Sequence, residues 1–433
     1  MNTSLVKTLM EELKKMPIID PHTHVRAEQP VARHLGELLG YHYYTELSNS
    51  SRGIPVPLPD DLDARIEYVW PHLPDLRGTV QFDWMMGISE FFFDIPRGDW
   101  FSRPKKEIVE RAQRAIRDGS YAQKVWSRSN ITQVYLTNQF DEDLSALQDS
   151  RLVPCLRTDD LVFNADRAGS LARLEKATGV APGRSLTAWR EALTKVFNRF
   201  SKWKMGYPAV GLPPSFIVVE NAEERASGLL EKLAEGKAFD EQSRRVWASF
   251  AIEEITRQCQ RVKTPYCLMA GADRGVYAQG VPSGQDLFRC DAHLRGYDWL
   301  LNKYPDVRFP FMIVSDTAGL ELAAAGWIRH NVYPMSHWWY ANNPTDIRRE
   351  LRRRLDVLPR TKFIGFHSDG YSLEFTLPKF NTYRLQLAIV LAERIEESQA
   401  VGSDSLEPIT VESALALAER ILLTNCGAIL GSR

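Results

Sequence analysis

Short apolar runs, often rich in β-branched or aromatic residues, alternate along the chain with longer segments whose apolar residues recur at helical spacing. Such runs are typical of buried strands, and the longer spacing is typical of amphipathic helices. The runs that predict strands are Ile18 to His24, Ile131 to Thr137, Leu152 to Arg157, Tyr266 to Gly271, Phe311 to Ser315, Asn331 to His337 and Phe363 to Asp369. The segments that predict helices are Pro104 to Asp118, Leu186 to Trp203, Ala222 to Glu235, Glu241 to Val262, Asp286 to Lys303 and Thr345 to Leu355.

This order of elements predicts an α/β fold with a parallel sheet, because apolar strands joined by crossover helices run parallel and are covered on both faces. A further, weaker strand is expected near Met205 to Leu212, where glycines and prolines interrupt the pattern. Eight strand–helix units close most simply into a (β/α)8 barrel of the TIM type. We expect residues 1–433 to form one such domain.

One segment does not fit the alternation. Residues 47–124 contain Trp70, Trp84, Trp100 and the run Phe91 to Phe93, but no convincing strand. A stretch this long and hydrophobic is not typical of a solvated loop. We predict a helical insertion after the first strand that caps the C-terminal mouth of the barrel, where active sites of this architecture lie.

Charge and composition narrow the classes of function. The chain has 54 Lys and Arg against 55 Asp and Glu, and this balance supplies no broad attraction to nucleic acid or anionic lipid. No run approaches the roughly 18 consecutive apolar residues of a membrane span, and the first residues show no apolar signal core. We expect a cytoplasmic protein with a small-molecule substrate and no nucleic-acid or membrane partner. The Arg-rich stretch Arg348 to Arg354 favours a solvated helix face over an anion-binding patch.

The strongest chemical signal is the segment Ile18-Ile19-Asp20-Pro21-His22-Thr23-His24. Side chains alternate along a strand, so His22 and His24 project from one face, which at this end of a barrel strand is the interior. Two imidazoles there could bind a divalent cation, or could merely cap the strand. The last strand ends in His367-Ser368-Asp369-Gly370 and lies beside the first in a closed barrel. We therefore predict a metal site of His22, His24 and Asp369, with capping of the following turn as the alternative role of Asp369.

With these residues in place, the sequence resembles the uronate isomerases (glucuronate and galacturonate isomerases) of the amidohydrolase superfamily. That superfamily has HxH on the first strand and a metal-binding Asp on the last, which matches His22, His24 and Asp369. Further similar segments, spread over nearly the whole chain, are His42-Tyr43, Thr137-Asn138, Arg157-Thr158-Asp159, Ser336-His337-Trp338-Trp339-Tyr340 and Asn425 through Gly431. The resemblance implies a barrel of the metal-dependent hydrolase type, a homo-oligomer, and aldose–ketose isomerisation of a hexuronate.

Three positions depart from the pattern of that family. Met269 and Val210 stand where the family has histidines on the fifth and fourth strands, and Tyr371 stands where a substrate-directed arginine is usual. His367 lies at a usually apolar position two residues before Asp369. Its imidazole could reach the space left by Met269 and act as a general acid or base or an extra metal ligand, or it could be a core histidine bonded to a carbonyl.

An aldose–ketose isomerase needs a base, a means of stabilising an enediol oxyanion, and a grip on the substrate. The candidate catalytic groups are Asp369, Tyr43, His42, His367 and a water on the metal. A uronate carboxylate could be clamped by Arg157 and Arg274, which could instead form ion pairs in the barrel rim. The remaining substrate candidates are Trp338, Trp339 and Tyr371, the tryptophans with barrel packing as their alternative. One divalent metal is expected, Zn²⁺ first, then Mn²⁺, Fe²⁺ or Co²⁺.

Two other classes of function remain open. The same metal apparatus could activate water to hydrolyse a small carboxylate or sugar-acid derivative, with Asp369 and His367 as proton carriers. The chain could also be a non-catalytic protein that binds sugar acids. The HxH segment and the inward Asp369 weigh against that class, whereas Met269 and Tyr371 are compatible with it.

Overall fold

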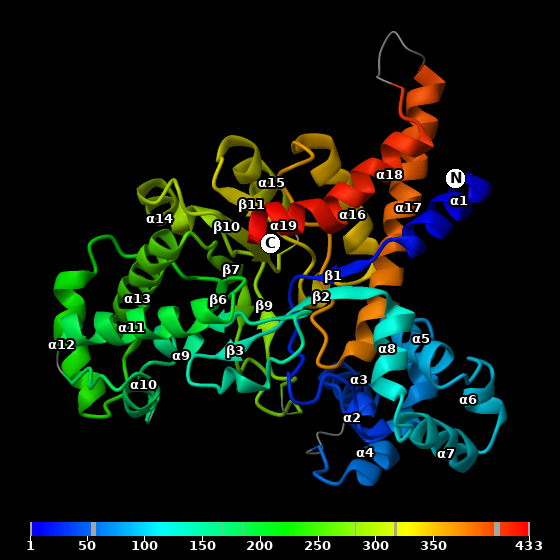
Figure 1. Cartoon of the computed structure of the whole chain (residues 1–433), viewed down its shortest axis with the longest axis horizontal. Coiled ribbons are helices and arrows are strands. Elements are labelled where there is room, and N and C mark those ends of the chain that lie inside the picture. Colours follow the sequence, from blue (N-terminus) through cyan, green and yellow to red (C-terminus); the bar gives the residue numbers. More distant parts are fainter. Residues whose placement is uncertain are drawn as a thin grey trace.

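The computed structural model describes residues 2–52, 58–167, 169–183, 185–281, 283–315, 318–401 and 408–431. Parallel strands follow one another around a central axis (Figure 1). In order of pairing the strands are β1 (Ile18–Asp20), β2 (Ile131–Tyr135) with β3 (Asn138–Gln139), β4 (Leu152–Val153) with β5 (Leu156–Arg157), β6 (Pro208–Leu212), β7 (Cys267–Ala270), β10 (Phe309–Ile313) and β11 (Val332–Pro334). This is the pairing order of the predicted barrel, and the predicted weak fourth strand is confirmed as β6.

The glycine-rich sequence before β6 has a packing reason. A Cβ atom at Gly206 would lie 2.6 Å from a ring carbon of Tyr135, so only glycine lets the chain pass this ring before β6 begins. The predicted third strand is divided into β4 and β5 by Pro154 and Cys155. Proline has no N–H to donate to a sheet, so a short break at Pro154 is expected.

The eighth segment closes the ring without forming a regular strand. Ile364 bridges to Met335, which follows β11. On the other side, Asp369 N–H donates to His22 O (3.2 Å), and His24 N–H donates to Gly370 O (2.8 Å). The prediction of a regular strand from Phe363 to Asp369 is therefore wrong, although the segment lies beside β1 as expected. Asp369 has a φ of 54°, in the left-handed region, which turns the chain out of the strand.

Most predicted helices are confirmed, within a few residues at their ends, as α7 (Lys105–Ile116), α11 (Leu186–Lys202), α12 (Glu223–Ala234), α13 (Glu241–Val262) and α16 (Pro344–Val357). The predicted helix from Asp286 to Lys303 is wrong over its first half. Leu287 and Phe288 form β9, which pairs antiparallel with β8 (Ala272–Asp273), and helix begins only at η3 (Leu294–Tyr297) and α14 (Asp298–Lys303). Tertiary pairing overrides the local helical spacing here, and Asp286 accepts the Gly275 N–H (2.9 Å) where the hairpin loop begins and ends.

From Leu35 onward, the chain between β1 and β2 consists of helices joined by turns, with no strand among its described residues. Its elements are α2 (Leu35–Leu39), α3 (His42–Arg52), α4 (Leu62–Val69), η1 (Trp70–Leu76), α5 (Val80–Phe92), α6 (Asp99–Ser102), α7 and α8 (Tyr121–Ser129). Residues 53–57 of the predicted insertion lie outside the described residues. In Figure 1, α5 to α8 gather to one side of the barrel, and α5 packs on α17 (Thr376–Val401). The domain boundaries proposed from the sequence stay a prediction.

The remaining elements complete the outer layer and the loops. They are α1 (Thr3–Lys15), η2 (Leu144–Ala146), α9 (Asp159–Val162), α10 (Ser170–Thr178), α15 (Ala318–Ile328), η4 (Trp339–Ala341), η5 (Leu373–Phe375), α18 (Val411–Glu419), η6 (Arg420–Thr424) and α19 (Asn425–Leu430). The last three form a continuous helix, residues 411–430, which is long and apolar enough to cross a membrane by length and composition alone. It packs against α1, α17 and β1. Asn425 Nδ2 donates to Phe363 O (2.7 Å), which holds the helix across the N-terminal end of the eighth segment.

Candidate metal centre and its cavity

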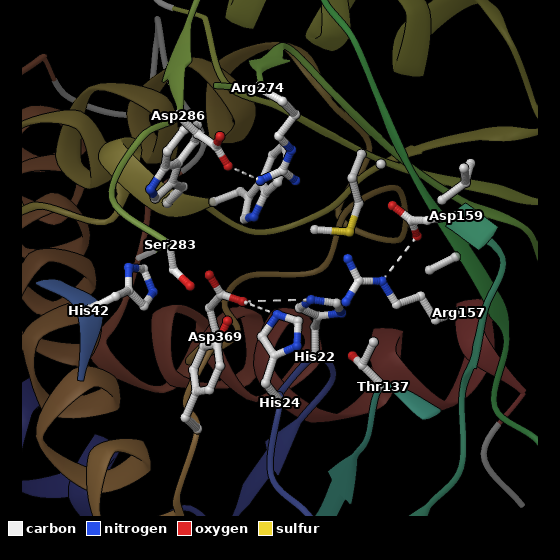
Figure 2. A pocket seen from close by; sticks show the side chains of 17 residues that line it. His22, His24, His42, Thr137, Arg157, Asp159, Arg274, Ser283, Asp286 and Asp369 are labelled. Atoms are coloured by element: carbon white, nitrogen blue, oxygen red, sulfur yellow. Dashed lines mark hydrogen bonds and ion pairs between the residues drawn. The ribbon is translucent and has the colours of Figure 1, made fainter. Parts of the chain in front are cut away.

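A cavity of about 290 Å³ opens at the C-terminal ends of the barrel strands (Figure 2). Every substrate-binding residue predicted from the sequence lines it: Arg157, Arg274, Trp338, Trp339 and Tyr371. The predicted metal ligands and His42 line it as well. Met269 and Val210, two of the positions that depart from the uronate isomerase pattern, line the cavity with apolar side chains, and so does the neighbouring Ala209. The volume is that of a site for a small molecule.

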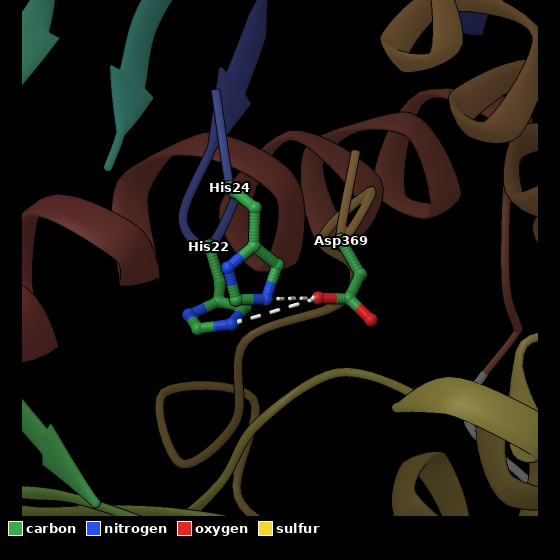
Figure 3. A group of neighbouring side chains, drawn as sticks. All are labelled: His22, His24 and Asp369. Carbon is green, nitrogen blue, oxygen red and sulfur yellow. Dashed lines mark ion pairs between the residues drawn. The ribbon is translucent and has the colours of Figure 1, made fainter. Parts of the chain in front are cut away.

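Three ligand-type side chains meet at the floor of this cavity (Figure 3). Asp369 Oδ1 lies 3.6 Å from His22 Nε2 and 3.3 Å from His24 Nε2. One ligand atom from each of the three residues lies within 4.8 Å of the other two. Side-chain exposure is 2% for His22 and 8% for Asp369, whereas His24 is 24% exposed on the cavity side. The closure of the barrel thus brings together side chains that are far apart in sequence.

The hydrogen bond between His22 and Tyr207 determines the tautomer of the His22 imidazole, and therefore whether the nitrogen that faces Asp369 carries a lone pair. The Tyr207 hydroxyl donates to Pro21 O, so its oxygen accepts a hydrogen from His22 Nδ1, which lies 3.3 Å away. His22 Nε2 is then unprotonated. Both His22 Nε2 and Asp369 Oδ1 are buried without a hydrogen-bond partner in the described part of the chain. Two facing acceptors repel each other unless a cation lies between them, so this donor set fits a divalent metal.

The protonation states of the three residues agree with metal binding. Burial, together with the neighbouring His367, lowers the pKa of His22 well below its usual range. Burial alone would raise the pKa of Asp369, but the interaction with His24 and the other imidazoles lowers it well below the ordinary value. A neutral imidazole and a carboxylate are the forms that bind metal ions.

A buried polar network holds the turn that carries Asp369. Lys379, on α17, donates from Nζ to Ser368 O (2.8 Å) and to the Tyr41 hydroxyl (3.1 Å), which in turn donates to Asp369 O (3.0 Å). Asp20 Oδ1 accepts the Ser368 N–H (2.9 Å). These hydrogen bonds hold the backbone of Ser368 and Asp369 in place. They therefore stabilise the left-handed backbone conformation at Asp369. Burial lowers the pKa of Lys379 to about 8 and raises that of Asp20 to about 6.

The two cavity arginines each have an acidic neighbour. Arg157 donates from Nε to Asp159 (3.2 Å), and Arg274 pairs from Nη1 with Asp286. Both arginines therefore form the rim ion pairs considered from the sequence and also line the cavity. The lining as a whole carries two arginines against three aspartates, so its formal charge is negative when the histidines are neutral.

Of the candidate proton carriers His42, Tyr43 and His367, His42 alone lines the cavity. His42 lines the cavity, and its Nδ1 lies 2.8 Å from Glu46 Oε1, one turn further along α3. Tyr43 is buried beside Tyr41 and does not line the cavity, and burial raises the pKa of its phenol well above the usual range. His367 lies behind His22, with ring centroids 5.2 Å apart, and does not line the cavity. Neither His367 nitrogen has a hydrogen-bond partner among the described residues, and burial lowers the pKa of its imidazole to about 4.

Several residues of the site were not singled out from the sequence. Glu46 could have been found, because Glu four residues after His42 on a helix is a recognisable pair. Asp286 and Ser283 also line the cavity, but they lie in the hairpin segment that local spacing mispredicted. Tyr371 replaces the expected arginine and stacks on His24, with ring centroids 4.7 Å apart. Burial and the nearby Asp369 raise the pKa of Tyr371 to about 12, so its hydroxyl remains a donor.

Comparison with known proteins identifies the fold. No protein-family model and no curated protein matches the sequence. Among solved structures, the uronate isomerase of Thermotoga maritima is similar with a TM-score of 0.86 at 18% identity, covering 99% of this chain and 97% of that chain. A uronate isomerase of Bacillus halodurans C-125 gives a TM-score of 0.79 at 19% identity over 99% and 97% of the two chains. A glucuronate isomerase of Caulobacter crescentus gives 0.85 at 16% identity over 99% and 95%. The resemblance drawn from the sequence is thus confirmed for the fold.

Proposed function

We propose that this protein is a metal-dependent isomerase that interconverts the aldose and ketose forms of a hexuronate. One observation carries the proposal: the unpartnered His22 Nε2 and Asp369 Oδ1 face each other at the floor of a small cavity that two arginines also line. The fold shared with uronate and glucuronate isomerases, over nearly the full length of each chain, supports this choice of reaction.

His22, His24 and Asp369 would hold one divalent cation, with Zn²⁺ our first choice because two imidazoles and one carboxylate are common zinc ligands. When bound, the cation supplies Lewis-acid stabilisation of the oxyanion that isomerisation develops. A divalent ion also changes the formal charge of the cavity lining from negative to positive. Binding of an anionic sugar should therefore depend on the metal even before any chemistry occurs.

The carboxylate of the sugar acid would bind to Arg157 and Arg274. Each arginine uses a single nitrogen for its aspartate partner, which leaves further N–H groups for a substrate carboxylate. The hydroxyl of Tyr371 adds a donor in the cavity where an arginine was expected, and Trp338 and Trp339 add apolar surface for the sugar ring. The positions of Met269 and Val210 offer no polar contact, so the grip on the sugar hydroxyls is weaker than the family pattern implies.

His42 is our choice of proton carrier. Glu46 accepts the proton of His42 Nδ1, so Nε2 is left as the basic nitrogen of a residue that lines the cavity. In the aldose-to-ketose direction, His42 would take the proton from C2 of the sugar and deliver it to C1. The proton of the O2 hydroxyl passes to O1, so that O2 becomes the new carbonyl oxygen and O1 the new hydroxyl. Tyr43 and His367 lie outside the cavity lining and would act only on residues that touch the substrate.

The test is to incubate zinc-loaded protein with D-glucuronate and D-galacturonate in D₂O and to follow both by NMR. We expect the ketose to appear and solvent deuterium to enter at the carbon next to the carbonyl. Asp369→Ala is the matched control, since it should lose metal and activity together. Absence of both ketose and deuterium from fully metallated wild type would refute the proposal. Cleavage of lactone or ester analogues in the same preparation would then favour hydrolysis. The cytoplasmic location and the homo-oligomer stay predictions.

A further inference from the structure

A second cavity lies behind the segment that carries Trp338 and Trp339. Its volume is about 220 Å³, and it lies between the ends of β10 and β11 and the helices α15 and α16. Its lining residues come from the end of β10 and the loop after it, from the loop after β11 with η4, from α15 and α16, and from Phe288. Phe288 and Tyr340 are 40% and 39% exposed, so the cavity opens to solvent. None of the residues proposed above for metal, substrate or proton transfer lines it.

Arg354 is the charged residue of this cavity for which the described part of the chain offers no ion-pair partner. The sequence predicted that Arg348 to Arg354 form a solvated face, and this prediction is wrong for Arg354, which is only 5% exposed. Its Nη1 is buried without a hydrogen-bond partner, and no carboxylate of the described residues lies within ion-pairing distance of its guanidinium. By contrast, Arg352 on the same helix is half-exposed and pairs with Glu393. A buried, unpaired guanidinium costs several kcal/mol in a protein, by order of magnitude, so such groups normally have an anionic partner.

The acidic residues of the lining are already engaged. Glu350 pairs with Arg353, and Asp346 pairs with Arg349. Glu350 is close enough to oppose, but not to cancel, the effect of burial, which lowers the pKa of Arg354. The guanidinium stays protonated at any physiological pH. Among the described residues of the lining, no carboxylate is therefore left to pair with Arg354, and its positive charge is open to a ligand.

Other hydrogen-bonding groups line the same cavity. Ser336 Oγ and His337 Nε2 are buried without partners among the described residues, and burial, together with Arg354, keeps the His337 imidazole neutral by lowering its pKa. Gly319, in the first turn of α15, also lines the cavity, and a Cβ there would collide with the Glu350 carboxylate and the Arg353 guanidinium. A hydroxyl, an imidazole and a guanidinium thus line one space, and the Glu350 carboxylate lies against the first turn of α15.

We propose that this cavity binds a small oxyanion, a phosphate or a carboxylate group, with Arg354 as its main partner. The ion would also stabilise the segment that separates the two cavities. Ser336 and Trp339 both have positive φ, 54° and 53°, a conformation that costs free energy at residues other than glycine. An ion bound to Ser336 and His337 would help hold the conformation in which the next two residues, Trp338 and Trp339, face the first cavity.

The test is calorimetric titration of metal-free wild type, Arg354→Met and Arg352→Met with inorganic phosphate and, separately, acetate, at ionic strength matched with NaCl. Removing the metal eliminates anion binding to the metal in the first cavity, and any binding to Arg157 and Arg274 there should be equal in all three proteins. We expect wild type and Arg352→Met to bind with the same affinity, and Arg354→Met to bind at least tenfold more weakly. A response to phosphate alone identifies a phosphate site, and a response to both anions identifies a site for any small oxyanion. No binding of either anion to wild type, or equal binding by Arg354→Met, would overturn the proposal.

Thermal unfolding gives an independent measurement on the same proteins. Without added anion, Arg354→Met should melt above wild type, because methionine removes an unpaired buried charge at similar volume. The anion that binds should raise the melting temperature of wild type and leave that of Arg354→Met unchanged. Should Arg354→Met not fold, Ser336→Ala keeps the charge and removes one donor, and should bind severalfold more weakly. An equal rise in melting temperature in wild type and in the folded variant would contradict the assignment.

Discussion

Tyr207 offers a sharp test of the metal centre, because it acts on a metal ligand without being one. Its ring is fully buried and stacks on Tyr135, with centroids 5.8 Å apart, so Tyr207→Phe keeps the packing and removes a single oxygen. That oxygen accepts the proton of His22 Nδ1 and donates to Pro21 O. Without it, the His22 N–H is either buried without a partner or moved to Nε2, where it points into the metal site.

The size of the effect follows from these two outcomes. Removing the hydrogen-bond partner of a metal-binding histidine typically lowers metal affinity about 10- to 100-fold, which corresponds to roughly 1.4 to 2.7 kcal/mol. Leaving buried partners unsatisfied costs about 1 to 3 kcal/mol of folding stability. We therefore expect Tyr207→Phe to fold, to be moderately less stable, and to bind Zn²⁺ 10- to 100-fold more weakly than wild type.

The assay is competition for Zn²⁺ between metal-free protein and a chelator of known affinity. Tyr266→Phe is the matched control, since Tyr266 is fully buried and its hydroxyl lies 3.3 Å from Thr158 Oγ1, with no bond to a predicted metal ligand. The control should lose stability and keep its zinc affinity. Equal zinc affinity in wild type and both variants would refute the assignment of the His22 tautomer, and with it the reasoning that Nε2 awaits a cation.

Three further predictions test other parts of the site. Glu46→Gln should lower kcat for D-glucuronate roughly 10- to 100-fold with little change in KM, because His42 keeps its place but loses its carboxylate partner; an unchanged kcat would argue against His42 as proton carrier. Arg274→Ala should raise KM about tenfold or more and change kcat less, and steady-state kinetics with an unchanged KM would contradict its role in substrate binding. Burial lowers the pKa of Lys379 to about 8 in the folded protein, against roughly 10.4 in the unfolded chain. Between these two pH values the unfolded chain binds more protons than the folded protein. The free energy of unfolding should therefore rise with pH across that window, by up to about 3 kcal/mol. Urea unfolding at pH 8 and pH 10 should show this rise in wild type relative to Lys379→Met, and parallel curves would contradict it.

The fold was largely predictable because its signals are local. The helix α13 (Glu241–Val262) begins and ends where its apolar spacing predicts, and β6 was located by the count of strands despite its glycines. Prediction failed where a distant partner overrides local preference. Leu287 and Phe288 lie in a segment of helical spacing but pair with β8. Arg354 lies in a charged run but is buried in the lining of the second cavity.

Some residues of the candidate site were predictable from local sequence, and others depend on contacts between distant parts of the chain. His22 and His24 were predictable from alternation along one strand, and Asp369 followed from the closure of the barrel. Tyr207 and Lys379 were not predictable, because each acts through the tertiary fold. Tyr207 bonds to His22 across 185 residues of sequence, and Lys379 bonds to Tyr41 across 338. No spacing rule connects such positions.

His22, His24 and Asp369 together should hold one metal ion. The most direct measurement is a crystal structure of zinc-loaded protein with diffraction recorded on both sides of the zinc absorption edge. We expect one strong anomalous peak about 2.0 to 2.2 Å from His22 Nε2, His24 Nε2 and an oxygen of Asp369. An anomalous map without a peak among these three side chains, from crystals that contain a full equivalent of zinc, would contradict it.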